Sequence, residues 1–209
     1  RIGFAASLLL VVAGVAGAAE RGLDSAQMRS WQIVCDPAAT ESERFAAAEF
    51  QALFKGMTGA ELPVVDAASR GGGAVFIGQD AVARSSKPAR PDQLGDEGLR
   101  IHVDKNGVYI DGGRPRGTLY GVYEFFEELC GVRFLTYDHT YYPPNAKSAR
   151  IPFGDRTYIP PFAFRWSYYG ETHKYPEFAT RLRVNTVSDD PKLGSKTGYR
   201  LVSHNVAYL

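Results

Sequence analysis

GGRPRGTLYGVYEFFEELCGVRFL, residues Gly112 to Leu135, is the stretch that decides the fold of this chain. It reads as a turn, an amphipathic helix and a strand. Its apolar side chains recur at steps of three and four residues, which places them on one stripe of a helix: Leu119, Val122, Tyr123, Phe126 and Leu129. Such a stripe has to be buried, and a sheet is the expected partner.

The two glycines within and after this helix predict its surroundings. Gly131 stands where the chain leaves the helix, so we expect a left-handed residue there, followed by a strand over Val132–Leu135. Gly121 lies inside the helix, where glycine costs about 1 kcal/mol relative to alanine. We therefore expect the helix to approach the sheet closely at Gly121.

Upstream residues predict the rest of one layered unit. Strands are expected at Trp31–Cys35, Leu62–Val65 and Ala74–Gly78. Between the first two, Thr40 and Glu43 have the spacing of a capping box that opens a helix. The apolar side of that helix is formed by Phe45, Ala48, Phe50, Leu53, Phe54 and Met57, and Gly59 closes it.

A hairpin completes this unit. Leu99–Val103 and Val108–Ile110 read as strands, and Lys105–Gly107 between them is expected to supply a turn residue with positive φ. The order of elements predicts an α+β accessory domain over residues 28–140, a mixed β-sheet with two helices packed on one face.

Beyond this unit the composition changes. Residues 141–161 are rich in Pro and Tyr and read as a linker containing a short extended segment. Residues 162–209 then predict a strand over Phe162–Tyr169, a short helix over Tyr175–Leu182 and a strand over Val184–Val187. This order indicates the first strand-helix units of an incomplete (β/α)₈ barrel, which needs roughly 250 residues.

The first 19 residues read as a signal peptide. A positive Arg1, an apolar run and the small-residue site Ala16-Gly17-Ala18 predict export, with an uncleaved anchor as the alternative. A start at Arg rather than Met indicates that this is not a complete reading frame. Cys35 and Cys130 favour two buried thiols, although an exported protein could bridge them.

Charge and motifs exclude several classes of function. A formal net charge of +1 gives no electrostatic reason to expect nucleic acid or an anionic membrane surface as partner. After cleavage of the signal peptide we expect no stable membrane insertion. The four histidines lack metal-ligand spacing, and Gly71–Gly73 lacks the Lys and Ser/Thr of a phosphate loop. We therefore expect no metal and no cofactor. The sequence leaves the oligomeric state open.

The strand Leu99–Val103, the hairpin, RGTLYGV at residues 116–122 and GVRFL at residues 131–135 together resemble a known type of domain. It is the non-catalytic domain that precedes the barrel in α-glucuronidases and family 20 β-hexosaminidases. The likeness extends over Trp31–Tyr169 and is greatest to exported bacterial proteins with the uncharacterised DUF4838 domain. The resemblance implies an accessory domain docked on a (β/α)₈ barrel that acts on carbohydrate.

Four residues are candidates for contact with a sugar. The resemblance places His204 in an early-barrel histidine segment. Glu171 follows the first expected barrel strand, where barrel active sites form, and Arg165 and Tyr168 lie on that strand. Glu171 could instead be a solvated loop residue, and the strand residues Arg165 and Tyr168 could instead pack within the barrel. Glycosidases need paired carboxyl groups, and the resemblance places that pair beyond Leu209.

Two functional hypotheses remain from the sequence. The first is the N-terminal part of an exported glycoside hydrolase, whose fragment here would be inactive because it lacks the catalytic acid and base. The second is a carbohydrate-binding or structural module without catalysis. A reading frame that continues into paired acids at barrel strand ends would favour the first.

Overall fold

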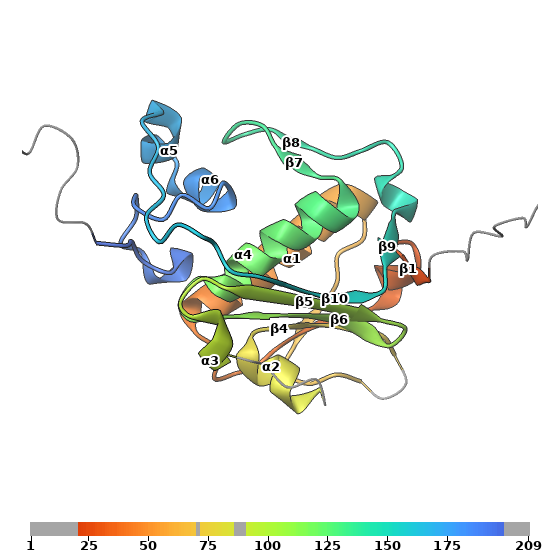
Figure 1. The fold of residues 1–209 in the computed structure, drawn as a ribbon. Coiled ribbons are helices and arrows are strands. Elements are labelled where there is room, and N and C mark those ends of the chain that lie inside the picture. The colour runs from red at the N-terminus through yellow and green to blue at the C-terminus, as the bar shows by residue number, and fades with distance from the viewer. Residues whose placement is uncertain (1–20, 70–71, 86–90, 199–209) are drawn as a thin grey trace, which may run out of the picture.

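The computed structural model describes residues 21–69, 72–85 and 91–198, and a six-stranded mixed sheet is its centre (Figure 1). The strand order is β10-β5-β6-β4-β2-β3. Strands β3, β2, β4 and β6 run parallel, whereas β5 and β10 are antiparallel to their neighbours. The strands are β2 (Gln32–Cys35), β3 (Val64–Val65), β4 (Ala74–Ile77), β5 (Leu99–Asp104), β6 (Gly107–Gly112) and β10 (Gly154–Tyr158).

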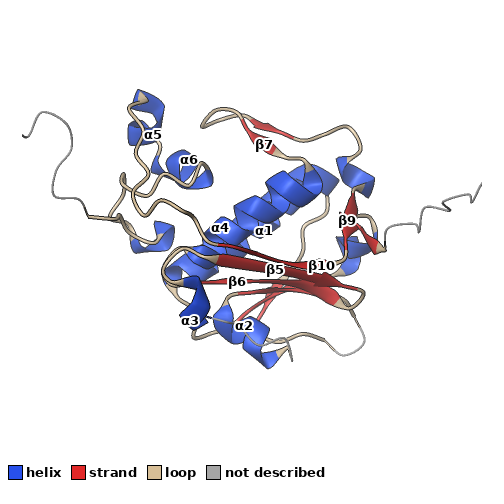
Figure 2. Ribbon diagram, viewed as in Figure 1, coloured by secondary structure: helices blue, strands red, loops and turns tan. Residues whose placement is uncertain are grey.

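Two long helical segments cover one face of this sheet, as Figure 2 shows in blue above the red strands. They are α1 (Glu41–Thr58) and α4 (Gly117–Glu124), the latter continued by the wider turn η2 (Phe125–Leu129). The predicted pair of helices on one face is confirmed. A short helix that the sequence analysis did not expect, α2 (Gln79–Arg84), packs Ala81 against Val34 and Ala74 on the opposite face.

Smaller elements surround this centre. Before α1 lie β1 (Gly22–Asp24) and η1 (Gln27–Ser30), and before β5 lies α3 (Pro91–Leu94). After α4 come β7 (Arg133–Phe134), β8 (Thr140–Tyr141), η3 (Ala146–Ser148) and β9 (Arg150–Pro152). The last elements are α5 (Gly170–Lys174), α6 (Pro176–Arg181) and η4 (Pro191–Leu193). Strand β1 pairs with β9 outside the main sheet.

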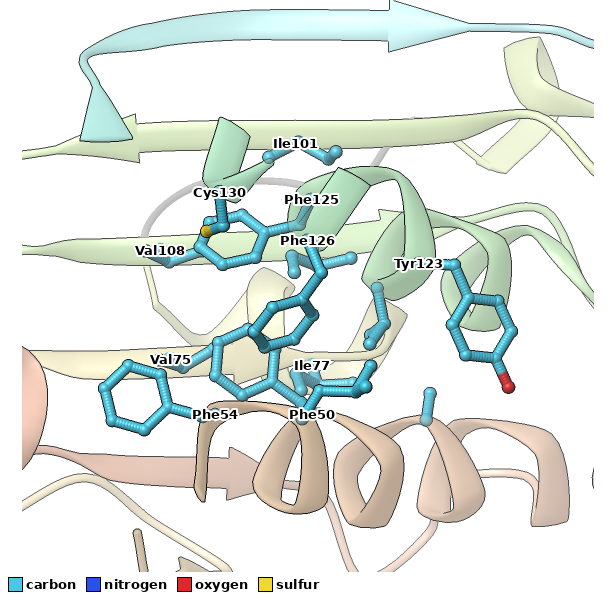
Figure 3. Close-up of a cluster of buried hydrophobic side chains, with 14 of the residues drawn as sticks. Phe50, Phe54, Val75, Ile77, Ile101, Val108, Tyr123, Phe125, Phe126 and Cys130 are labelled. Atoms are coloured by element: carbon cyan, nitrogen blue, oxygen red, sulfur yellow. The ribbon is translucent and has the colours of Figure 1, made fainter. Parts of the chain in front are cut away.

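Four of the five side chains of the predicted apolar stripe on the central helix are fully buried, and Leu129 is half-buried. Leu119, Val122, Tyr123 and Phe126 are all 0% exposed. Figure 3 shows Phe126 pointing between the two helices toward Phe50 of α1, and their ring centroids lie 4.9 Å apart. Aromatic rings at this distance add to the free energy gained from burial. The stripe therefore seals the core between α1, α4 and the sheet.

The predicted helix ends are also confirmed. The Thr40 hydroxyl accepts a hydrogen bond from the Glu43 amide (3.2 Å), and the Glu43 carboxylate accepts one from the Thr40 amide (2.9 Å), which is the capping box. Gly59 and Gly131 have φ values of 80° and 73°, so both occupy the left-handed region. Cys35 and Cys130 are buried free thiols, and burial raises the pKa of both.

Two local predictions are wrong. None of residues 105–107 has positive φ. Instead the Asp104 carboxylate accepts the amides of Asn106 (2.8 Å) and Gly107 (3.1 Å), so a side chain closes the hairpin turn. The strand after the central helix is shorter than predicted, and β7 pairs with β8 rather than with the main sheet. The edge beside β5 is occupied by β10.

The later part of the chain differs most from expectation. Residues 154–158, which were placed in the linker 141–161, form the edge strand β10. Residues 162–169 and 184–187 form no strand. The two parallel strands expected at the start of a barrel are therefore not formed by these residues. Among the described residues, one backbone–backbone hydrogen bond joins these two segments, from the Asn185 amide to the Arg165 carbonyl (3.2 Å), and the others involve side chains. The predicted helix of this region is present as α6.

The predicted signal peptide lies outside the described residues. Within the described ranges, no helix combines the length and the apolarity needed to span a bilayer.

The effect of Gly121→Ala on the free energy of unfolding distinguishes helix propensity from overpacking. Helix propensity alone predicts a gain of about 1 kcal/mol for Gly121→Ala. However, a Cβ at Gly121 would lie 2.8 Å from Cγ2 of Ile110 on β6. Overpacking of this kind costs about 1–3 kcal/mol. We therefore expect Gly121→Ala to lower the free energy of unfolding, measured by urea denaturation.

A matched control is Gly170→Ala in α5, where a Cβ would meet nothing within 4 Å. That variant should unfold at the same or a higher urea concentration than the unmodified protein. A more stable Gly121→Ala protein would show that the helix does not approach β6 as closely as described.

The contact of Asp155 on β10 with Arg100 makes the stability of the protein depend on pH. The Asp155 carboxylate accepts two hydrogen bonds from Arg100 of β5, at 3.0 and 2.9 Å. These bonds hold the pKa of Asp155 below its usual 3.8, although partial burial opposes them. The stabilisation is therefore present above pH 4 and is lost as the pH falls through the folded-state pKa. Because Asp155 is 42% exposed, we expect less than about 1 kcal/mol.

Asp155→Asn should accordingly lose less stability than the unmodified protein between pH 7 and pH 3, compared by urea midpoints. Equal losses in both proteins would mean that the Arg100 contact does not contribute to holding β10 on the sheet.

Candidate functional site

A buried cluster of polar side chains joins the sheet half, residues 21–158, to the C-terminal segment, residues 162–198. We call it the Glu97 junction, and its members are Glu97, Arg116, Arg165 and Asn185. The Glu97 carboxylate accepts hydrogen bonds from Arg116 Nε (2.6 Å) and Asn185 Nδ2 (2.8 Å) and forms an ion pair with Arg165 Nη2 (2.7 Å). Glu97 is 8% exposed and Arg116 6%.

Arg116 extends the junction along the chain. It stands at the start of α4 and donates to the carbonyls of Gly194 (3.0 Å) and Ser195 (2.9 Å) and to the Thr197 hydroxyl (2.9 Å). One guanidinium thus fixes the last described turn of the C-terminal segment against the helix. Breaking a buried ion pair of this kind costs about 3–5 kcal/mol, because the remaining charge stays buried without a partner.

Further arginines of the C-terminal segment bind acids of the two long helices. Arg181 donates two hydrogen bonds to Glu49 of α1, both at 2.9 Å. Although burial disfavours its charge, the bonds with Glu49 raise the pKa of Arg181 above its usual value. Arg183 forms ion pairs with Glu124 (3.3 Å) and with Glu127. The C-terminal segment is therefore held by several charged contacts.

Aromatic rings beneath these arginines line the same interface. Arg165 lies 5.7 Å from the ring centre of Tyr120, and Arg183 lies 5.9 Å from that of Tyr123. Both tyrosines come from the central helix. Burial, with a smaller contribution from Glu97, raises the pKa of Tyr120 to about 12. The helix that seals the core thus also presents tyrosines to the C-terminal segment.

The predicted site residues do not come together as one site in the described structure. The Arg165 guanidinium belongs to the junction and also donates to the Arg183 carbonyl (2.8 Å). Tyr168 is 75% exposed, and Glu171 is exposed at the start of α5. His204 lies outside the described residues. Of the four, only Arg165 is placed in a buried polar cluster.

Three members of the junction were not anticipated. Glu97 lies in a charged loop and reads as solvated, and Arg116 reads as part of an exposed turn. Asn185 lies in the expected strand Val184–Val187, where no pattern in the sequence singles it out. Its amide side chain accepts from the Arg165 amide (2.9 Å) and donates to the Ala163 carbonyl (2.8 Å).

Large side chains on the C-terminal segment remain uncovered. Phe162 is 72% exposed and Tyr169 79%, and Trp166 packs on Tyr168 with ring centres 4.2 Å apart. Exposed apolar patches often mark binding or packing faces, so these side chains are candidates for such a face. Within the described ranges, no three His, Cys, Asp or Glu side chains gather as a metal site would require.

Comparisons with known proteins agree with this architecture. A family model described as the glycosyl hydrolase family 67 N-terminus matches residues 13–125. No curated protein sequence matches the chain significantly.

Solved structures of carbohydrate enzymes share the fold. A mutant Streptomyces plicatus β-hexosaminidase in complex with GlcNAc is 22% identical, with a TM-score of 0.50 over 76% of this chain and 29% of that one. The family 20 β-N-acetylhexosaminidase of Streptomyces coelicolor is 19% identical, with a TM-score of 0.50 over 76% and 30%. A family 115 4-O-methyl-α-glucuronidase with specificity for decorated arabinogalactans is 12% identical, with a TM-score of 0.51 over 75% and 24%. The chain therefore spans less than a third of each of these proteins.

Proposed function

Because this chain belongs to the family of glycosyl hydrolase family 67 N-terminal domains, we propose that it is the non-catalytic N-terminal part of an exported, carbohydrate-active enzyme. The family match supports the α-glucuronidase part of the resemblance over residues 13–125. The finer likeness to proteins with the DUF4838 domain remains part of this proposal, as does the predicted export.

The Glu97 junction is the observation that carries the proposal. Buried ion pairs between two parts of a chain are costly to separate, so they hold the two parts in a fixed arrangement. Here Glu97, Glu49 and Glu124 each bind an arginine of residues 162–198. We infer that the sheet half serves to hold the first units of a catalytic barrel in place.

The uncovered aromatic residues support the same role. Phe162 and Tyr169 lie on the segment that the junction fixes, and both are more than two-thirds exposed. In the proposed enzyme, the rest of the barrel packs on this face. We propose that Tyr168 and Glu171 lie near a barrel rim in this arrangement and that they and His204 contact the substrate. Arg165 positions residues 162–169 through the junction.

The carboxylates of the C-terminal segment support a catalytic pair located elsewhere. A glycosidase needs two carboxyl groups about 5–9.5 Å apart with different protonation states. Glu177 is engaged by Lys192 (2.9 Å), and Asp189 by Lys196 (2.7 Å). Asp190 accepts the Lys192 amide (3.0 Å). We therefore propose that neither acid nor base comes from these residues.

The test compares two proteins, the 209-residue chain and the product of the complete reading frame. Both are assayed against aryl glycosides and uronic-acid oligosaccharides. We expect turnover by the complete product and none by the chain. Glu171→Gln in the complete product should raise KM. Absence of turnover with every substrate, or hydrolysis by the chain itself, would contradict the proposal; sugar binding without turnover would favour a binding module.

A further inference from the structure

A pocket lies where the β7–β8 hairpin meets helices α5 and α6, away from the Glu97 junction. Its volume is about 230 Å³. The sheet half contributes Tyr137, and the C-terminal segment contributes the other lining residues used below: Lys174, Tyr175, Glu177 and Asp190. The pocket therefore lies at the contact between the two parts.

The aromatic wall of this pocket is already ordered. The rings of Tyr137 and Tyr175 stack with centres 3.7 Å apart and an angle of 6° between their planes. A hydrogen bond with Tyr175 is the main cause of a raised pKa at Tyr137. Lys174 lies 5.2 Å from the centre of the Tyr175 ring. A ligand that binds beside this pair does not have to order it first.

The polar groups at the pocket mouth are fixed as well. Lys192 donates to Glu177 (2.9 Å) and lies 5.3 Å from the ring centre of Phe45 on α1. Asp190 caps the short helix η4 through the Lys192 amide (3.0 Å). Asp190 also forms an ion pair with Lys192 (3.8 Å). A carboxylate offers about four acceptor positions, so both Glu177 and Asp190 can accept further hydrogen bonds.

Charge and size limit what fits. Arg181 at the pocket wall is paired with Glu49, so Lys174 and Lys192 face the two carboxylates Glu177 and Asp190 with no excess of either sign. A strongly charged ligand gains little from such a site. Pockets for drug-sized ligands measure about 300–1,000 Å³, so this one suits a smaller, single-ring molecule.

We propose that this pocket binds one pyranose ring of a neutral saccharide. The C–H face of the ring lies against Tyr137, whose ring is supported by its stack on Tyr175, and apolar carbon and aromatic surface match there. Its hydroxyls donate to Glu177 and Asp190 and accept from Lys174. The pocket lies next to the substrate contacts proposed above, because the Tyr175 amide donates to the Glu171 carbonyl (2.9 Å), but neither Tyr168 nor Glu171 lines it. It binds sugar whether or not the complete protein is an enzyme.

The test is a titration of the uniformly ¹⁵N-labelled 209-residue chain with glucose, galactose, xylose, N-acetylglucosamine and glucuronate, followed by NMR. We expect saturable shifts at the amides of Tyr137, Tyr175 and Glu177 with at least one neutral sugar. Tyr137→Ala should weaken binding at least tenfold, and Glu177→Gln several-fold. Tyr137→Phe keeps the stacking and should bind within about threefold of the unmodified chain.

The hairpin offers a matched control. Tyr141 on β8 is 43% exposed against 40% for Tyr137, but it does not line the pocket. Tyr141→Ala should leave binding unchanged, and the NMR spectrum of each variant reports whether it is folded. Absence of shifts with all neutral sugars, a response to glucuronate alone, or equal weakening by Tyr137→Ala and Tyr141→Ala would overturn the proposal.

Discussion

Glu97→Gln should lower the free energy of unfolding by about 3 kcal/mol and loosen residues 162–198. The substitution keeps the shape of the side chain but leaves the guanidiniums of Arg116 and Arg165 without their shared counter-charge. The expected loss lies at the lower end of the range for buried pairs because the Arg165 side chain is 21% exposed. Chemical denaturation measures the stability, and limited trypsin digestion measures the loosening.

The control for this prediction is Glu61→Gln. Glu61 pairs with Lys55 on the surface, where both side chains are more than half exposed. Such pairs contribute about 0–1 kcal/mol, so this variant should resemble the unmodified protein in both measurements. If Glu97→Gln were no worse than Glu61→Gln, the junction would not hold the segment.

Phe126→Ala is expected to cost about 3–5 kcal/mol, because it opens a cavity between two packed helices. Phe126 is 0% exposed and touches two further buried rings, Phe50 at 4.9 Å and Phe125 at 5.3 Å between centroids. Urea denaturation followed by circular dichroism gives the change.

Phe162→Ala removes the same side chain from a site that is 72% exposed. Surface changes of this kind usually stay within about 0.5 kcal/mol. Similar losses from both phenylalanine variants would mean that the central helix does not seal the core.

The elements that the sequence predicts well are those specified by neighbouring residues. The capping box of Thr40 and Glu43 involves residues three positions apart, and the apolar stripe of the central helix repeats every three to four positions. Gly59 and Gly131 end helices through their own backbone freedom. Because these signals involve only neighbouring residues, they can be recognised from the sequence alone.

The features that were missed depend on distant partners. Strand β10 is exposed at all five positions, so it has no alternating pattern, and only its pairing with β5 makes it a strand. Glu97 reads as a solvated loop acid, yet its hydrogen-bond partners Arg116 and Asn185 lie 19 and 88 residues away. The hairpin turn after Asp104 was predicted, but its expected positive φ was wrong because the Asp104 side chain accepts the backbone amides of the turn.

The predicted strands of the C-terminal segment show the same limit. Phe162–Tyr169 has the aromatic content of a strand, but the structure gives it no ladder partner among the described residues. A strand is stable only beside another strand. The junction instead fixes this segment by side chains and single backbone bonds.

Hydrogen exchange of the unmodified chain tests the central claim most directly. The amides of Asn185 and Thr197 donate to the carbonyls of Arg165 (3.2 Å) and Asn185 (2.7 Å). If the sheet half holds the C-terminal segment, both should exchange at least about tenfold more slowly than in an unstructured peptide. Glu97→Gln should remove this protection while the β6 amides keep theirs. Exchange of Asn185 and Thr197 at peptide rates in the unmodified protein would contradict the account.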